Sequence, residues 1–199
     1  MQYALNENQG RITPIPGATA TCTCCKSPVL AKCGTINVWH WAHENREDCD
    51  TWYEPETLWH RNWKEFFPKE NQEVVIGNHR ADIRTQYGVI ELQNSSISAE
   101  EIMERERFYG NMIWVVNAES FLHNFKTKYA NTDFTYETFR WKHARKCWGY
   151  AKCPVYLDVG DAWLFLIKKM HFKNGCGGWG VSYSKEWLLK KYGVKEYED

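Results

Sequence analysis

The amino-acid sequence predicts a mixed α/β fold of the α+β class, in which a few helices alternate with short strands. An apolar stripe with helical spacing runs through residues 54–67, three β-type runs follow in residues 72–93, and a second helix signal begins at Ser98. We therefore expect a core with the order helix, three strands, helix, strand. A small Cys/His-rich module precedes this core, and a C-terminal α+β extension follows it.

The overall charge hides a division along the chain. The 25 basic residues of this 199-residue sequence balance its 25 acidic residues, so a basic pI does not argue for nucleic-acid binding. Residues 1–119, however, contain 11 basic and 17 acidic residues, whereas residues 120–199 contain 14 basic and 8 acidic residues. This division indicates an acidic site beside a basic docking surface.

The sequence carries no targeting or membrane signal that we recognise. Its first ten residues, MQYALNENQG, lack a basic region followed by an apolar stretch, and the longest apolar run, residues 162–167, is too short to span a bilayer. We therefore expect a cytoplasmic protein without a membrane partner. In a reducing compartment its eight cysteines are expected to be metal ligands or buried thiols rather than disulfides.

The Cys/His-rich module spans the sequence CTCCKSPVLAKCGTINVWHWAH, residues 22–43. Residues 1–20 before it are polar and contain two prolines, which indicates an irregular lead-in with room for one short strand. Within the module, Cys22 and Cys25 have the spacing of a zinc knuckle, and His40 and His43 repeat that spacing. The two pairs together supply the four ligands of a closed, structural zinc site.

Other interpretations of this module stay open. The ligand set is not unique, because Cys24 and Cys33 lie nearby and Cys49 follows. The alternative to zinc is a set of buried thiols with partly solvated histidines.

The first core helix is expected within YEPETLWHRNWKEFF, with Pro55 in its first turn and its end before Pro68. Its polar face places Glu56, His60 and Lys64 in one row, at positions i, i+4 and i+8. The row is either part of a catalytic site or a solvated helix face with weak ion pairs.

Three strands are expected at residues 72–76, 79–85 and 88–93, separated by the turns at Gly77 and Gly88. Asp82 and Glu91 interrupt two of these mostly apolar runs. If both carboxylates point inward, they require a cation, and Mg²⁺ is the usual partner of carboxylate oxygens. The alternative is that both acids lie at strand ends in solvent.

The remaining elements follow from caps and apolar runs. A capping box from Ser98 to Glu101 opens a helix that continues to Tyr109, and a short buried strand covers residues 112–116. In the last third we expect a helix over residues 118–130, strands near 135–142, 154–158 and 162–168, a glycine-rich loop at 174–180, and a closing helix over 184–192.

Four separated motifs carry a resemblance to a known family. They are CTCC-x14-HWAH, ETLWHRNWK, RADI, and IELQNSSIS followed by ERERFYGNMIWVVN, and together they cover residues 22–117. The sequence resembles the competence protein CoiA-like family of PD-(D/E)XK, or restriction-endonuclease-like, nucleases with an N-terminal zinc ribbon. The resemblance implies a restriction-endonuclease-like αβββαβ core.

The resemblance also implies roles for residues of the core. Glu56, Asp82, Glu91 and the carbonyl of Leu92 are expected to hold a catalytic Mg²⁺ or Mn²⁺. Gln93 stands where the wider superfamily has a lysine; its amide can position water but brings no charge. Lys64 is expected to supply that charge from the first helix, and His60, in the same row, completes the candidate catalytic set.

Substrate contacts are expected from two regions. The resemblance implies that Ser95, Arg105 and Tyr109 contact the nucleic acid or support Gln93, while the competing explanation of Arg105 is an ion pair with Glu101 within the helix. Farther along, residues 126–150 interleave cations, including Arg140 and Lys142, with aromatic rings, half of which are expected in the core. Five later Cys and His residues are interpreted as turn positions and buried thiols rather than a second metal site.

Together these observations predict a Mg²⁺-dependent deoxyribonuclease that acts in DNA processing or recombination. Its expected parts are a zinc-ribbon module in residues 1–50, a nuclease core in 51–118 and a basic, aromatic extension in 119–199. Single-stranded or branched DNA is the expected partner, and a homodimer is possible. The alternatives are a non-catalytic DNA-binding recombination mediator and a zinc-dependent protein-interaction module.

Overall fold

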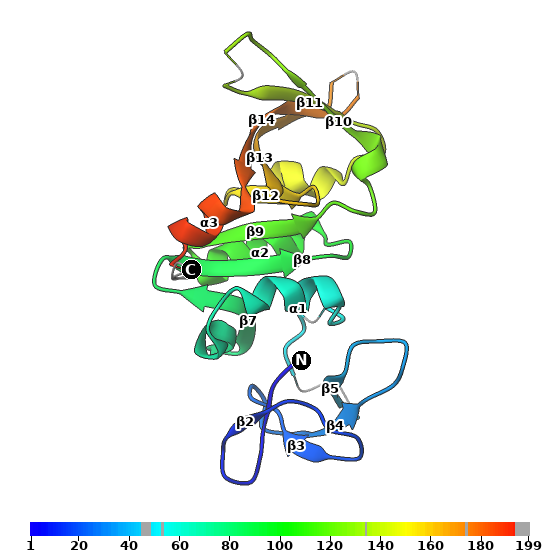
Figure 1. Ribbon diagram of the computed structural model, residues 1–199, viewed down its shortest axis with the longest axis vertical. Helices are drawn as coiled ribbons and strands as arrows, with labels where there is room; N and C mark the ends of the chain where they lie inside the picture. Colours follow the sequence, from blue (N-terminus) through cyan, green and yellow to red (C-terminus); the bar gives the residue numbers. More distant parts are fainter. Residues whose placement is uncertain (45–48, 53, 134, 174, 194–199) are drawn as a thin grey trace. The chain divides into compact units, whose positions relative to one another are not determined.

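The structure is a computed structural model that describes residues 1–44, 49–52, 54–133, 135–173 and 175–193. The chain forms two compact units, Met1–Arg84 and Thr85–Asp199, and each is described by itself (Figure 1). Helices and strands are both present, so the α+β prediction is confirmed. No helix among the described residues has the length and apolar character needed to cross a membrane.

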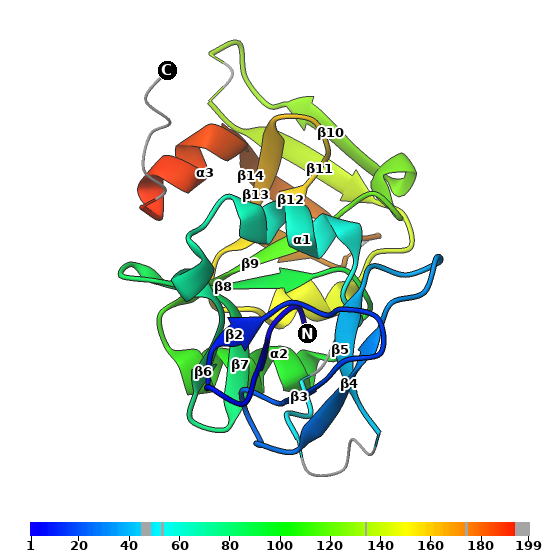
Figure 2. The same cartoon turned by 60° about the horizontal axis from the view of Figure 1, so that its bottom comes forward.

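The N-terminal part of the first unit is a five-stranded antiparallel sheet with the order β2-β1-β3-β4-β5. Figure 2 labels four of these strands, β2, β3, β4 and β5. A small apolar cluster supports it, in which Cys22, Val29 and Trp41 are buried with Met1 and Ala4. Three strands form in the polar lead-in, where we expected at most one. The strands are β1 (Ala4–Leu5), β2 (Arg11–Ile12), β3 (Thr19–Thr21), β4 (Pro28–Lys32) and β5 (His40–His43).

The first unit continues with one helix and a hairpin. These elements are α1 (Leu58–Glu65), the 3-10 turn η1 (Lys69–Asn71), β6 (Gln72–Ile76) and β7 (His79–Thr85). Helix α1 begins later than predicted, because Thr57 caps it and accepts a hydrogen bond from the backbone N–H of His60. Pro55 and Glu56 therefore precede the helix, whereas the bounds of β6 and β7 are those that the sequence predicts.

The second unit begins with a strand, a helix and a parallel strand: β8 (Gly88–Gln93), α2 (Ala99–Tyr109) and β9 (Met112–Asn117). Ser98 caps α2 as predicted, accepting from the backbone N–H of Glu101 at 3.0 Å. The predicted order of helix, three strands, helix and strand is thus confirmed along the chain.

The other strands extend this sheet. Within the second unit its order is β10-β11-β14-β13-β12-β9-β8, with β9 parallel to both β12 and β8 and the remaining pairs antiparallel. The added elements are η2 (Leu122–Asn124), β10 (Phe125–Tyr129), β11 (Glu137–Trp141), η3 (Lys146–Tyr150), β12 (Val155–Asp158), β13 (Trp163–His171), β14 (Gly177–Ser184) and α3 (Lys185–Lys191).

Two predictions for the last third are wrong. Residues 118–130 do not form a helix, because β10 pairs along its whole length with β11, a segment that follows it in sequence. Part of the glycine-rich stretch is strand β14 rather than a loop. There the glycines permit close pairing, since a Cβ at Gly178 would lie 1.8 Å from the carbonyl oxygen of Lys169.

Several aromatic rings pack in the core of the second unit. Trp114 on β9 packs edge-on against Trp148 of η3, with ring centroids 5.3 Å apart. The indole N–H of Trp114 donates to Glu106 on α2, whose carboxylate also accepts from the backbone N–H of Lys152. Helix α2 and η3 therefore pack together beside the sheet.

Candidate functional site

The first unit gathers four metal-type ligands, Cys22, Cys25, His43 and Cys49, whose ligand atoms all lie within 4.8 Å of one another. The two sulfurs of Cys22 and Cys49 are 3.8 Å apart, and Nε2 of His43 lies 3.2 Å from the sulfur of Cys25. Ligands of one tetrahedral zinc ion are separated by about 3.3–3.8 Å. The cluster therefore fits zinc, and it is the one such group among the residues that the structure describes.

The fourth ligand differs from the one that the sequence predicts. His40 and His43 lie three residues apart in strand β5, and side chains with that spacing point to opposite faces of a strand. His43 reaches the cluster, while Nδ1 of His40 lies 2.9 Å from the carbonyl oxygen of Val38. The prediction that His40 is a zinc ligand is therefore wrong. Cys49 is the fourth residue of the cluster instead.

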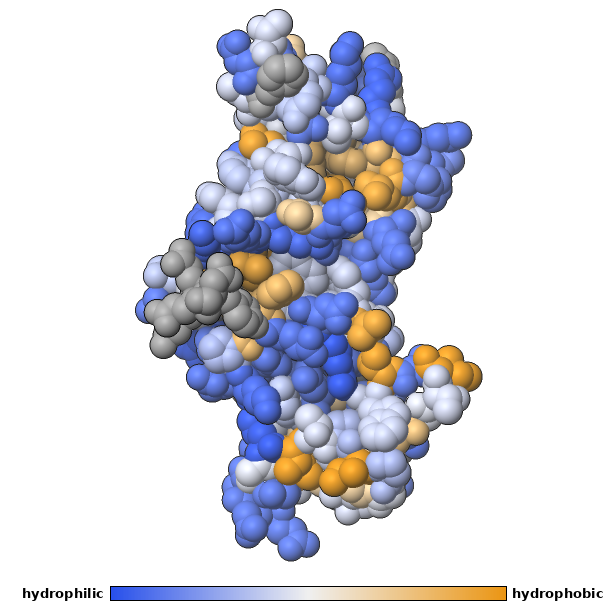
Figure 3. All heavy atoms as spheres, in the orientation of Figure 1, coloured by the Kyte–Doolittle hydropathy of each residue, from blue (hydrophilic) through white to orange (hydrophobic). Residues whose placement is uncertain are grey.

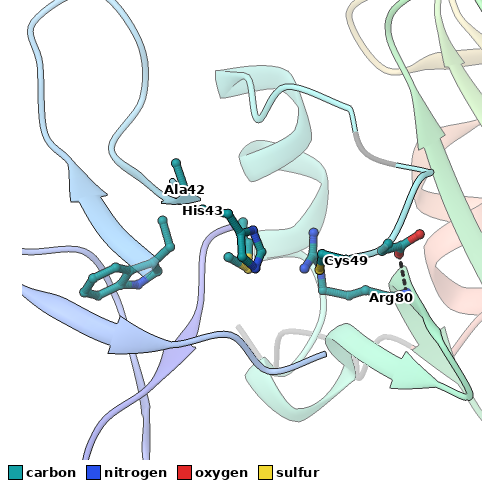
Figure 4. Close-up of a pocket in the computed structure, with 7 residues that line it drawn as sticks. Ala42, His43, Cys49 and Arg80 are labelled. Atoms are coloured by element: carbon teal, nitrogen blue, oxygen red, sulfur yellow. Dashed lines mark hydrogen bonds between the residues drawn. The ribbon is translucent and has the colours of Figure 1, made fainter. Parts of the chain in front are cut away.

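Local contacts hold Cys49 in position. The neighbouring Asp50 accepts hydrogen bonds from the backbone N–H of Arg80 at 2.7 Å and lies 2.8 Å from Nδ1 of His79, so it ties this segment to β7. His43, Cys49 and Arg80 line one pocket (Figure 4). Burial and the nearby Cys22 raise the pKa of the Cys49 thiol to about 12, and a bound zinc ion is the kind of charge that reverses such a shift.

Arg80 adds a positive charge beside these sulfurs. Its Nη1 atom is buried and has no hydrogen-bond partner among the described residues. A zinc ion with three thiolates and one histidine carries a net negative charge, which a nearby guanidinium stabilises. The side chain therefore suits a role as the electrostatic partner of the loaded cluster.

A second cluster in the first unit surrounds Lys64, whose side chain is 1% exposed. Its ammonium lies 3.0 and 2.9 Å from the two carboxylate oxygens of Glu56 and 2.9 Å from Glu73. Burial alone would lower the pKa of Lys64, but Glu73, Glu56 and Asp82 outweigh it and raise the pKa. This shift favours the charged ammonium form of Lys64.

Glu73 is the acid that sequence reasoning missed. The pairs Gln72–Ile83 and Val74–Ala81 place it opposite Asp82 on the neighbouring strand. Its carboxylate also accepts from the backbone N–H groups of Gln2 and Tyr3, at 2.7 and 3.1 Å. The sequence signal for Glu73 is weak, because it follows Gln72 at the polar start of strand QEVVI rather than interrupting an apolar run as Asp82 does.

Asp82 is half-buried on the face of β7 that also carries Arg80, while Ala81 and Ile83 face the core. Its charge contributes to the raised pKa values of Lys64 and His60. Asp82, Glu56 and Glu73 therefore share one electrostatic environment in the first unit.

His60 belongs to the same unit but is engaged elsewhere. Its Nδ1 lies 2.7 Å from the hydroxyl of Thr57, and its Nε2 lies 3.3 Å from Glu54. Burial would lower its pKa, yet Glu54 and Asp82 raise it above the ordinary value. Nδ1 also accepts from the backbone N–H of Thr57 at 3.3 Å, so the residue completes the capping box that holds the start of α1.

The second unit carries Glu91 on β8, buried and paired with Arg105 of α2 at 2.8 Å. Nε of Arg105 also donates to Glu101 at 3.1 Å, and the guanidinium lies over the ring of Trp114. The intrahelical pair is thus present. Because Arg105 is 5% exposed, the structure favours its support of Glu91 over contact with a nucleic acid.

Gln93 follows Glu91 by two residues and is 3% exposed. Its amide nitrogen donates to the carbonyl oxygen of Ser95 at 3.4 Å, and Arg145 donates to the same oxygen at 3.2 Å. The amide oxygen of Gln93 is buried without a hydrogen-bond partner among the described residues. A buried acceptor of this kind is suited to bind and orient a water molecule.

The other residues predicted to contact the substrate differ in how far their side chains are exposed to solvent. Ser95, Arg140 and Lys142 are exposed, and Tyr109 is half-buried with its ring edge-on to Phe108. The rings of Phe139, Trp141 and Trp148 in the basic segment are buried, which confirms that part of its aromatic content is core.

Comparison with family models gives two matches. The model described as "Competence protein CoiA, N-terminal domain" matches residues 18–51, which contain all four residues of the Cys/His cluster. The model described as "Competence protein CoiA, nuclease-like domain" matches residues 70–166, which contain Glu73, Asp82, Glu91 and Gln93. Glu56 and Lys64 lie between the two matches. No curated protein and no solved structure matches the chain significantly.

Proposed function

Because this chain belongs to the competence protein CoiA family and carries a nuclease-like domain, we propose that it is a Mg²⁺-dependent nuclease that hydrolyses phosphodiester bonds in DNA. The observation that carries the proposal is the arrangement around Lys64, a buried ammonium held by Glu56 and Glu73 in the field of Asp82. Such groups are expensive to bury, and perturbed, charged clusters of this kind concentrate at functional sites.

In the first unit, acidic side chains provide the proposed ligands of the divalent cation. Glu56 and Glu73 hold the ammonium of Lys64 and the charge of Asp82 acts on it, so a divalent cation has oxygen ligands available in Glu56 and Asp82. Such an ion lowers the pKa of a bound water and stabilises charge on the phosphate. Lys64 contributes a fixed positive charge for the same phosphate.

In the second unit, we assign catalytic roles to Glu91, the Leu92 carbonyl and Gln93 because they lie in the family motif IELQ. Arg105 orients Glu91, and the buried amide oxygen of Gln93 accepts a hydrogen bond from the attacking water. This glutamine brings no charge, unlike the lysine found at this place in the wider superfamily.

Zinc in the Cys/His cluster has a structural role in this scheme. The cluster contributes four protein ligands, so it leaves no open position for a reacting water. Zinc at this site stabilises the small N-terminal sheet, whose apolar core consists of few residues.

The proposal is tested by a cleavage assay with single-stranded, duplex and branched DNA in Mg²⁺ or Mn²⁺. We expect cleavage by the wild type and its loss in Asp82→Ala and in Glu91→Ala. The exposed Glu100 provides a matched control, and Glu100→Ala should cleave normally. Circular dichroism checks that each variant remains folded. Cleavage that survives Asp82→Ala unchanged would contradict the proposal.

A non-catalytic recombination mediator is the second candidate. It is favoured by the internal ion pairs, since Glu56 and Glu91 already have the cationic partners Lys64 and Arg105 without a metal. Wild-type protein that binds DNA but cleaves none of the substrates in either metal would support the mediator.

A further inference from the structure

We propose that one exposed face of strands β10, β11, β14 and β13 binds single-stranded DNA. This inference rests on the proposed function only for the choice of DNA, and it names the form of that substrate. We call the surface the single-strand face and define it by six residues: Lys126, Lys128, Tyr136, Arg140, Lys169 and Trp179.

Strand register places the members of this face together. Lys126 pairs with Arg140, which in turn pairs with Gly177 of β14. One row farther along, Lys128 pairs with Thr138, Thr138 with Trp179, and Trp179 with Lys169. Paired residues of an antiparallel sheet lie on the same side, so these side chains form adjacent rows.

The opposite side of the same strands is core. Phe125, Phe139, Trp141 and Phe165 are buried there, and their rings contact one another. Because the aromatic side of each strand is fixed by this packing, the alternate cationic side must face outward. Hydrophilic side chains accordingly gather around the β10–β11 end of the second unit (Figure 3).

The charge of the face is not compensated. Lys126, Lys128, Arg140 and Lys169 are exposed, and none takes part in an ion pair within the described part of the chain. The four strands contain a single carboxylate, Glu137, which lies buried on the core side and accepts from Ser182. Four cations on a sheet face without acids are complementary to a chain of phosphates.

Two aromatic rings make the face selective for unpaired bases. Trp179 and Tyr136 are each 39% exposed and pack edge-on, with centroids 5.8 Å apart. Exposed rings beside cations stack on bases that are not already paired and stacked within a duplex. The combination therefore favours a single strand.

Gly177, which pairs with Arg140, borders a hollow in the surface. It lines this hollow of about 390 Å³ together with Arg140, His171 and Lys173. A Cβ at Gly177 would lie 2.7 Å from the carbonyl oxygen of Phe139 and 3.3 Å from Cε1 of His171, so glycine permits the close approach of β14 to β11 at this edge of the hollow. Glycine within a strand often marks a place where another chain approaches closely.

The test is fluorescence anisotropy of the full chain with a labelled 20-nucleotide oligothymidine, in a buffer without added Mg²⁺ or Mn²⁺ so that cleavage does not contribute. We expect the double variant Lys126→Ala/Arg140→Ala to bind more weakly and to reduce the slope of log K against log salt by about 1.4. Trp179→Leu should weaken binding by about tenfold with the salt slope unchanged. The matched control is Lys190→Ala/Lys191→Ala on α3, which removes two cations elsewhere in the unit.

Several results would overturn the inference. One is that Lys126→Ala/Arg140→Ala binds oligothymidine with wild-type affinity. Another is that the control variant Lys190→Ala/Lys191→Ala loses as much affinity as Lys126→Ala/Arg140→Ala. A third is that duplex DNA or oligouridine binds the wild type as tightly as oligothymidine does. Thermal unfolding of each variant shows whether a loss of binding reflects loss of fold. If oligothymidine binding is absent while Asp82-dependent cleavage persists, the single-strand face is refuted and the nuclease proposal stands. If binding holds while cleavage is absent, the face survives and the nuclease proposal fails.

Discussion

Replacing Glu73 with glutamine tests the buried charge cluster most directly. The carboxylate accepts from Lys64, which is almost completely buried, and from two backbone N–H groups near the N-terminus. Removing one partner of a buried ion pair leaves the other charge without compensation, which typically costs about 3–5 kcal/mol. Glu56 still neutralises Lys64 in the variant, so we expect a loss near the lower limit, about 3 kcal/mol.

Urea unfolding at pH 7 measures this loss, with the exposed Glu70→Gln as the matched control. The control should change the unfolding free energy by less than about 0.5 kcal/mol. A destabilisation of Glu73→Gln as small as that of the control would refute the view that this carboxylate balances Lys64.

The same contacts predict a pH dependence. Burial alone would raise the pKa of Glu73, but Lys64 and Arg80 hold it well below the ordinary carboxyl value. The stability that the ionised group contributes is therefore present above the unfolded-state pKa near 4.5 and is lost as the pH falls toward the lower folded-state pKa. Stability measured from pH 7 to pH 3 should decline less steeply in Glu73→Gln than in the wild type.

Three further predictions concern metal and catalysis. We expect metal analysis to find zinc in the wild type and in His40→Ala but not in Cys49→Ser. The reverse pattern would support the ligand set predicted from the sequence, in which His40 binds zinc. Lys64→Met should lower the cleavage rate by about 100-fold in a single-turnover assay, and an unchanged rate would remove Lys64 from the mechanism. Addition of Ca²⁺ should strengthen DNA binding by the wild type but not by Asp82→Ala, because the acidic cluster needs a cation before it approaches a phosphate.

The local elements of the core were predictable because their signals are local. The caps at Ser98 and Ser184 and the alternation in residues 72–93 depend on neighbours within a few residues, and the structure confirms these elements. Helix α1 was predicted with a start that is too early, since Thr57 competes with Pro55 as a start signal and its cap determines where the helix begins.

The errors arise where a distant segment decides the outcome. Residues 125–129, FKTKY, alternate β-forming residues with lysines, a strand signal that the helix prediction missed, and β11 offers them a complete row of partners. Glycine at 177, 178 and 180 indicates a loop by composition, yet β13 and β11 enclose it in the sheet. Pairing between distant segments is invisible to local propensity.

The sequence by itself determined that this protein has a Cys/His ribbon, a nuclease-like order of elements and acids within apolar strands, because motifs and periodicity record local chemistry. Only the tertiary structure decided that Cys49 joins Cys22, Cys25 and His43, and that Glu73 shares Lys64 with Glu56. It also decided which cations of the last third lie together on one side of a sheet. The physical reason is that ligand sets, buried ion pairs and surface patches depend on strand register and side-chain direction, which are set by contacts between residues far apart in the chain.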